Sequence, residues 1–103
     1  MKIEQYGYII AFKVLPKLTP KERVKFFRKL YGYIDRSQYG KYLYRRDGLL
    51  TEGGYVQFTR GVFIVRKDLL RKVKSFLKGK AEVMVREVRL TEGDINILYV
   101  NRR

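Results

Sequence analysis

The sequence contains no cysteine, no histidine and no tryptophan. Without cysteine the chain cannot form a disulfide, and without cysteine and histidine it lacks the thiolate and imidazole ligands of most zinc sites. The missing histidine also removes the most common general base, so any catalysis would have to use carboxylate, Tyr, Lys or Arg groups. We therefore expect no cofactor and favour a non-enzymatic function.

Acidic residues are also scarce. Against 24 Lys and Arg there are only 10 Asp and Glu, which gives a formal net charge of +14 and a pI near 10.2. Self-repulsion of this size opposes the compact state, so the composition predicts a polyanionic partner, with nucleic acid first and an anionic membrane surface second. The carboxylates are scattered, and the pairs Glu82/Glu87 and Glu92/Asp94 are better explained as charge balance than as a metal site.

Long hydrophobic runs are absent as well. No segment is apolar enough for a membrane span, neither expected helix has a large exposed apolar face, and no signal-peptide pattern opens the chain. We therefore expect no membrane partner and a cytoplasmic location. Asparagine is limited to Asn96 and Asn101, which together with the high charge favours a thermophilic source. The 46% of hydrophobic residues in a chain of 103 predict one domain over residues 1–103.

The first third predicts a strand and a helix. Residues 1–15 are almost continuously apolar from Tyr8 onward, as in a covered strand. The segment 19–22, Thr-Pro-Lys-Glu, has the pattern of a capping box with proline at the first helical position. A helix should follow and end between Gly32 and Asp35, and its expected apolar stripe consists of Val24, Phe27, Leu30, Tyr31 and Ile34.

The middle third predicts two hairpins. Asp47-Gly48 is a strong two-residue turn signal between 42–46 and 49–52. A second hairpin should pair 55–59 with 62–66 around Arg60-Gly61. Its register would place Val56, Phe58, Phe63 and Val65 on the core face, and Tyr55, Gln57, Thr59, Ile64 and Arg66 on the opposite face.

The last third predicts a helix and two strands. The helix should run from Asp68 to Lys78, end at Gly79 and bury Leu69, Leu70, Val73, Phe76 and Leu77. Strands are expected over 81–90 and 95–100, and a shift of the apolar phase suggests a bulge near Arg86-Glu87. The order of elements predicts an α+β fold, namely a ferredoxin-like βαββαβ sandwich. It would have an antiparallel sheet, two helices on one face and an extra β-hairpin.

The densest functional signal is the segment 38–48, QYGKYLYRRDG, in which tyrosines alternate with basic residues. Alternation along a strand should place Tyr42, Tyr44 and Arg46 on one face. Tyr rings can stack on bases while Arg and Lys bind phosphates, although Tyr is also common in strands and basic residues also protect sheet edges. The candidate nucleic-acid-binding residues are Tyr39, Lys41, Tyr42, Tyr44, Arg45, Arg46, Tyr55, Gln57, Arg60 and Arg66. The basic residues of the two helices are equally well explained as solvated faces.

A family resemblance involves the second half of the chain. The segment 55–63, the helix 68–77 and the segment 94–98 are similar to the small ferredoxin-like CRISPR-associated proteins of spacer adaptation, over about residues 55–98. The resemblance implies a metal-dependent nuclease with an acidic residue at the end of its first strand. Here that strand reads Ile9-Ile10-Ala11-Phe12-Lys13, without an acid, which implies a catalytically silent relative that binds nucleic acid.

The sequence therefore predicts a small, basic, non-enzymatic protein that binds nucleic acid, with RNA favoured over DNA. Phosphate neutralisation and Tyr stacking would supply the binding, in the setting of a ribonucleoprotein assembly. Two alternatives stay open. One is a nuclease, and the other is a homodimeric interaction module that pairs through a free strand edge such as Ile95 to Val100.

Overall fold

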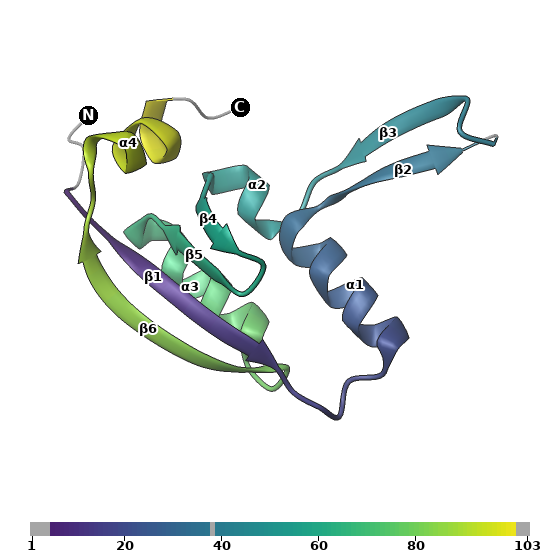
Figure 1. Ribbon diagram of the computed structural model, residues 1–103, viewed down its shortest axis with the longest axis horizontal. Coiled ribbons are helices and arrows are strands. Elements are labelled where there is room, and N and C mark those ends of the chain that lie inside the picture. Colours follow the sequence, from purple (N-terminus) through teal and green to yellow (C-terminus); the bar gives the residue numbers. More distant parts are fainter. Residues whose placement is uncertain (1–4, 38, 101–103) are drawn as a thin grey trace.

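A four-stranded antiparallel sheet forms the centre of the computed structural model, which describes residues 5–37 and 39–100 and has an α+β architecture (Figure 1). The elements are β1 (Tyr6–Val14), α1 (Pro20–Tyr31), β2 (Tyr33–Ser37), β3 (Tyr42–Arg46), α2 (Leu49–Gly53), β4 (Val56–Thr59), β5 (Val62–Val65), α3 (Lys67–Leu77), β6 (Ala81–Arg89), α4 (Glu92–Ile95) and the π-helical turn η1 (Asn96–Val100). Among the described residues, no helix combines the length and apolar character that crossing a membrane would require.

The sheet has the order β4-β5-β1-β6, so the first strand lies in its interior. The expected N-terminal strand is confirmed over Tyr6–Val14, and residues 1–4 of the predicted range lie outside the described residues. Strand β1 pairs with β5, with Ile10 opposite Phe63, and with β6 in an unbroken register from Tyr6 opposite Arg89 to Val14 opposite Ala81. The bulge expected near Arg86-Glu87 is therefore wrong.

The main core lies on one face of the sheet, beneath α1, α2 and α3. Its buried members are Ile10, Val14, Phe26, Leu30, Leu50, Phe63, Val65, Leu69, Val73 and Leu77. The expected α3 residues are found there, with Leu70 and Phe76 partly buried. In α1 the expected stripe is confirmed for Phe27, Leu30 and Tyr31, which are buried in or packed against this core, and is wrong at two positions. Phe26 is buried while Val24 is 50% exposed, and Ile34 lies beyond the helix in β2.

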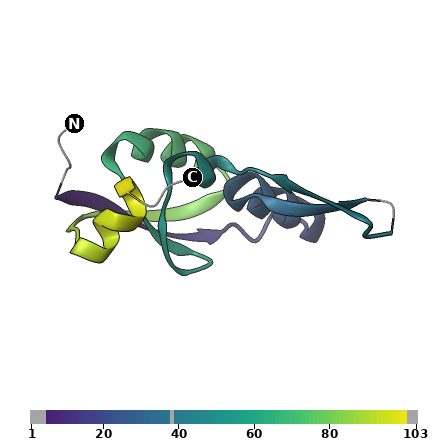
Figure 2. The same cartoon turned by 90° about the horizontal axis from the view of Figure 1, so that it is seen from above.

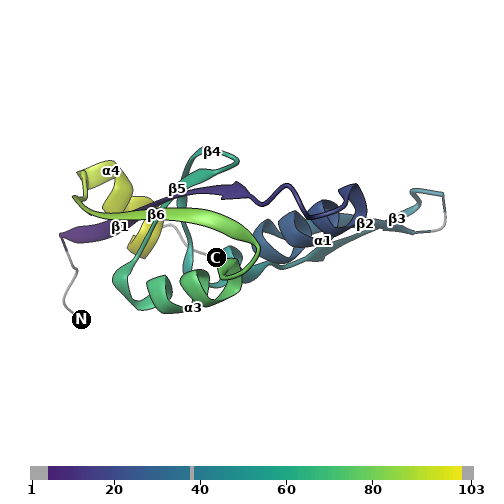
Figure 3. The same ribbon diagram turned by 90° about the horizontal axis from the view of Figure 1, so that it is seen from below.

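A second, smaller core lies on the other face of the sheet, beneath α4 and η1. It consists of Ile64, Leu90 and Leu98, and Figure 3 shows α3 and α4 on opposite faces. The predicted strand over 95–100 is wrong, because the Thr91 hydroxyl and the Asp94 carboxylate form a capping box that starts a helix there. This second core also explains the apolar phase shift in β6, because its two ends face different cores.

Strands β2 and β3 form a separate two-stranded arm that projects from the body of the molecule (Figures 1 and 2). The hairpin turn predicted at Asp47-Gly48 is wrong. The chain turns between Ser37 and Tyr42, where Tyr39 and Gly40 have φ of 59° and 84°, and the segment after Gly48 is helix α2. Helix formation is favoured at that point because it buries Leu50 completely in the main core.

The β4–β5 hairpin has a different register from the expected one. Val56 lies opposite Ile64 and Gln57 opposite Phe63, and the pairing shifts between Gln57 and Thr59. Phe63 and Val65 face the main core as predicted. Tyr55, which was expected on the opposite face, also packs against the main core, whereas Val56 packs against the second core and Phe58 is 59% exposed. The bulge accounts for the error, because a shift of one position moves side chains to the other face.

The two ends of the arm cross in direct backbone contact at Gly32 and Gly48. A Cβ atom on Gly48 would lie 2.6 Å from the carbonyl oxygen of Leu30, and one on Gly32 would lie 2.9 Å from the backbone nitrogen of Gly48. Gly32 also has a φ of 81°, which an L side chain rarely adopts. Only glycine therefore permits this crossing.

We predict that Gly48→Ala lowers the free energy of unfolding by about 3 kcal/mol, because the new methyl group meets backbone atoms that cannot move aside. The φ of Gly48 is −106°, a value that alanine also adopts, so the loss of stability would come from the steric clash alone. Denaturant unfolding measures it. The control is Gly93→Ala, whose Cβ would meet only the Thr91 hydroxyl at 3.7 Å. Equal stability of the two variants would contradict the crossing.

Candidate nucleic-acid interface

The arm presents two chemically different faces. Cross-strand neighbours share a face, and the pairs Tyr33/Arg46, Asp35/Tyr44 and Ser37/Tyr42 form what we call the tyrosine face. The reverse face consists of the pairs Ile34/Arg45 and Arg36/Leu43. The expectation that Tyr42, Tyr44 and Arg46 share one face is thus confirmed, although the strand partner differs from the predicted one.

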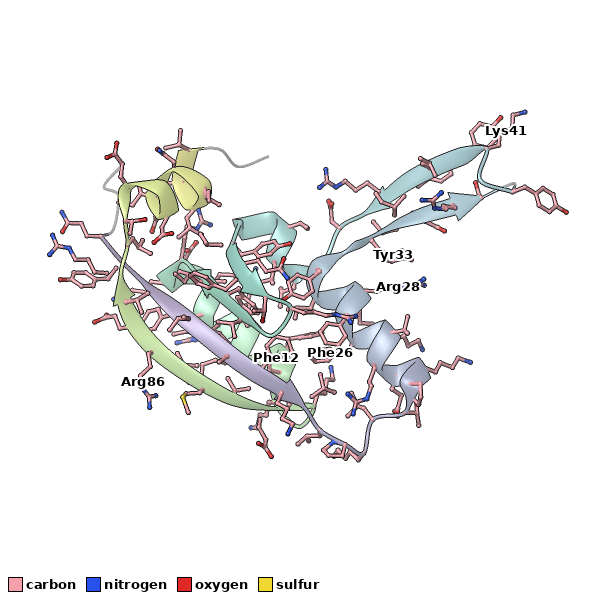
Figure 4. The ribbon with its side chains drawn as sticks, viewed as in Figure 1. Phe12, Phe26, Arg28, Tyr33, Lys41 and Arg86 are labelled. Carbon is pink, nitrogen blue, oxygen red and sulfur yellow. The ribbon has the colours of Figure 1, made fainter. Side chains whose placement is uncertain are left out.

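Each tyrosine of the tyrosine face has a cation beside its ring. The Arg28 guanidinium of α1 lies 4.5 Å from the centre of the Tyr33 ring, and Figure 4 shows both side chains between the arm and α1. The Lys41 ammonium lies 5.6 Å from the Tyr42 ring. The Arg46 guanidinium lies 5.7 Å from the Tyr44 ring. Ring faces and positive charges therefore alternate along this surface.

One of these cations is held in place by an ion pair. The Nη2 atom of Arg46 lies 3.1 Å from the Asp35 carboxylate across the strand pair. Both side chains are substantially exposed, so the pair contributes little to stability. Its effect is to orient the guanidinium beside the Tyr44 ring.

The arm exposes more apolar surface than a free ribbon normally tolerates. Every residue of β3 is exposed, with Leu43 at 59% and Tyr44 at 49%, and Ile34 on β2 is 52% exposed. An isolated two-stranded hairpin is at best marginally stable in water, and a contiguous exposed apolar surface usually marks an interaction site. The arm is therefore the most exposed element of the sheet structure, and its apolar side chains resemble those of known interaction sites.

Two grooves continue from the base of the arm. The first, which we call the arm-root groove, has a volume of about 560 Å³ and lies between the arm, α2 and Tyr55. The second, which we call the Arg60 groove, has a volume of about 420 Å³ and lies between α1 and the β4–β5 turn. Both are lined by Tyr31, Gly32 and Tyr55, so they share one wall.

This shared wall is anchored in the main core. The rings of Tyr31 and Tyr55 lie 5.6 Å apart, and each packs edge-on against Phe63. The Tyr31 hydroxyl donates a hydrogen bond to the carbonyl oxygen of Arg60. The Arg60 guanidinium lies 3.7 Å from the centre of the Phe27 ring. A cation is thus held over the groove by a rigid aromatic support.

The structure brings most of the predicted residues together. Tyr39 and Lys41 lie at the tip of the arm, and Tyr42, Tyr44 and Arg46 lie on its tyrosine face, while Arg45 is on the reverse face. Tyr55, Gln57 and Arg60 line the Arg60 groove. Arg66 lies apart from them, next to Tyr99 of η1 at 5.5 Å and paired with Asp68 at 3.1 Å.

Sequence reasoning missed Tyr33 and Arg28 as members of this surface. Tyr33 fell within the range, Gly32 to Asp35, in which the first helix was expected to end. Arg28 was one of the basic helix residues for which phosphate contact and a solvated face were equally good explanations. The usable signal was Gly32, which ends the helix and leaves Tyr33-Ile34-Asp35-Arg36-Ser37 as an alternating segment before the turn at Gly40.

Within residues 5–37 and 39–100, no three or more Asp, Glu, His and Cys residues gather in a way that could hold a metal ion. Comparisons with protein-family models, with curated proteins and with solved structures found no match for this chain. The case for function therefore depends on the arm and the two grooves.

The pKa of the Tyr31 hydroxyl is raised from 10.0 to about 12, mainly by burial and also by Tyr55, against the opposing effect of Arg60. Because the folded-state pKa lies above the unfolded value, protonated Tyr31 contributes stability that is complete below about pH 10 and is lost as the pH rises toward 12.

We predict a tyrosinate absorbance step near pH 12, with the free energy of unfolding decreasing between pH 10 and 12. In Tyr31→Phe the step should disappear and the decrease should become smaller. Identical ultraviolet titrations of the two proteins would contradict the assignment.

Proposed function

We propose that this chain is a small basic protein that binds nucleic acid, RNA in preference to DNA, without catalysing a reaction on it. The observation that carries the proposal is the tyrosine face of the exposed arm, on which each of the three rings has a cation beside it. Tyr rings and guanidinium groups both stack on bases, and the same cations bind phosphates.

The binding surface would extend from the tip of the arm to the Arg60 groove. Four cations lie along this path, Arg28, Lys41, Arg46 and Arg60, and two more, Arg36 and Arg45, lie on the reverse face of the arm, where Arg45 also lines the arm-root groove. A flexible single strand could place bases on the tyrosine face while its backbone follows these charges. The preference for RNA follows because proteins read RNA mostly at loops and ends with unpaired bases. A ribonucleoprotein, in which such an arm enters folded RNA, is the setting that fits this surface.

The proposed fold is a ferredoxin-like sandwich into which the arm and α2 are inserted. Without β2, β3 and α2, the remaining order is strand, helix, two strands, helix and strand, followed by α4 and η1. The sheet order β4-β5-β1-β6 supports this proposal, because it places the first of the four remaining strands between the third and the fourth.

A nuclease is the enzymatic alternative, either active or as a silent relative of the CRISPR adaptation proteins that residues 55–98 resemble. The position of interest at the end of β1 holds Phe12 and Lys13 in place of an acid. Labelled RNA and DNA incubated with and without divalent ions separate the alternatives. Intact substrate supports a binding protein, and cleavage that depends on the added protein supports a nuclease.

We predict that the affinity for single-stranded RNA falls with salt with a log-log slope of about −4, because six cations would neutralise about six phosphates. Fluorescence anisotropy over a salt series measures the slope. Replacement of Arg28 and Arg60 by Ala should reduce its magnitude by about 1.4. Absence of binding at low salt would overturn the proposed function.

We predict that combined Tyr42→Ala and Tyr44→Ala substitutions weaken single-strand binding by about 2 kcal/mol or more, and duplex binding by much less. Duplex bases are already stacked and cannot use the rings. The matched control is Tyr6→Ala, since Tyr6 on β1 is 47% exposed, similar to Tyr42 at 42% and Tyr44 at 49%. Equal losses for single strand and duplex would argue against stacking.

A further inference from the structure

Strand β6 is a long edge of the sheet without a strand neighbour on its outer side among the described residues. It has nine residues and pairs with β1 without interruption. The opposite edge, β4, has only four residues and contains a register shift. Short or bulged edges resist pairing with another chain, whereas a long regular edge is a template for it. The two edges are therefore not equivalent, and β6 is the one that can accept a strand.

The hydrogen bonds at both ends of β6 show which backbone groups face outward. The carbonyl oxygen of Lys80 accepts a bond from the nitrogen of Leu15, and the nitrogen of Leu90 donates to the carbonyl oxygen of Gln5. Even-numbered residues therefore bond toward β1. The odd-numbered residues from Ala81 to Arg89 present their N–H and C=O groups to the free side. There the Val85 carbonyl oxygen accepts a hydrogen bond from the Arg86 guanidinium at 2.8 Å, which pairing with a second strand would replace.

The side chains of β6 are complementary to those of a second, antiparallel copy of the same strand centred on Met84. On the face of the sheet that carries the second core, Glu82 and Arg86 lie two positions before and after Met84, which is 58% exposed. On the face of the main core, Val83 and Val85 lie on either side of Met84 in the sequence, and Val83 is 39% exposed. A second copy running antiparallel about Met84 places Glu82 opposite Arg86 twice, Val83 opposite Val85 twice, and Met84 opposite Met84.

We propose that two copies of this chain pair through β6 in this register to form a two-fold symmetric homodimer. The register also satisfies the backbone, since the odd-numbered residues Val83 and Val85 meet as hydrogen-bonded pairs and Met84 meets its copy as a non-hydrogen-bonded pair. Such an isologous contact closes at two subunits and leaves no further β6 edge free.

Neighbouring registers lack this match. A shift of the centre to Val85 places Val83 opposite Glu87 and Met84 opposite Arg86. A shift to Val83 places Lys80 opposite Arg86, and a shift to Arg86 places that residue opposite its own copy. Opposite charges or apolar pairs stabilise cross-strand neighbours and like charges destabilise them. Met84 is thus the favoured centre.

The dimer would separate the two arms. Arg86 on β6 and Lys41 at the arm tip lie at opposite ends of the molecule (Figure 4), whose largest extent is 45 Å. A two-fold axis at β6 perpendicular to the sheet keeps α1, α2 and α3 of both copies on one side of the joined sheet and points the arms outward. Association must overcome the repulsion between two chains of charge +14. Added salt should therefore strengthen the dimer, while it weakens nucleic-acid binding.

Disulfide trapping tests the register, since the chain has no cysteine of its own. In Met84→Cys the two Cα atoms would be about 4.5 Å apart, within the range of a disulfide. In the control Arg89→Cys, on the same strand but outside the proposed pairs, they would be offset by ten residues, or about 33 Å. Under mild oxidation of nuclease-treated protein, only Met84→Cys should give a covalent dimer. Equal cross-linking of both variants would overturn the register.

A charge-swap series tests the contact in solution by sedimentation equilibrium at moderate salt. Glu82→Arg and Arg86→Glu should each weaken association about tenfold, because each creates two like-charge pairs. The double variant should return to within about threefold of the unmodified chain. Exclusively monomeric behaviour of the unmodified chain, or failure of the double variant to recover, would overturn the proposal. RNA anisotropy of the same variants reports the proposed function separately.

Discussion

The rest of the structure depends on strand β1, which is hydrogen-bonded along both edges and covered on both faces. Its neighbours are β5 and β6, so its backbone groups are satisfied within the sheet. Ile10 faces the main core and Ile9 packs against the second core. A strand buried in this way reads as a continuous apolar run and not as an alternating one. The two layers of helices are arranged about this strand, and the arm is built outside them.

Local signals were sufficient wherever the local and global preferences agree. The capping box at Thr19 and Glu22 starts α1 as its sequence indicates, and Gly32 ends that helix. Helix α3 shows the same agreement, with Leu69, Val73 and Leu77 buried on one side. In these segments the local sequence is enough to predict the helix, because the residues that form its apolar pattern are also the ones that pack into the core.

The errors arise where distant contacts decide between two locally acceptable structures. Asp47-Gly48 suits a hairpin turn, but Leu50 reaches the core only if a helix follows. The apolar segment after Asp94 suits a strand, but Leu98 is buried only when η1 lies over the sheet. The contact between the arm and α1 could not be predicted from the sequence for a similar reason. Arg28 and Tyr33 belong to different elements, and nothing in their spacing shows that a guanidinium lies over a ring.

The crossing of Gly32 and Gly48 makes the arm a separable module. Its two ends meet in backbone contact, so the core beneath does not depend on how many residues lie between them. The closure entropy of such a segment grows only logarithmically, by about 0.6 kcal/mol for each doubling of length. Evolution could therefore lengthen, shorten or re-sequence the arm while the sheet stays unchanged. The proposed binding surface is then free to diversify separately from the part of the chain that forms the core.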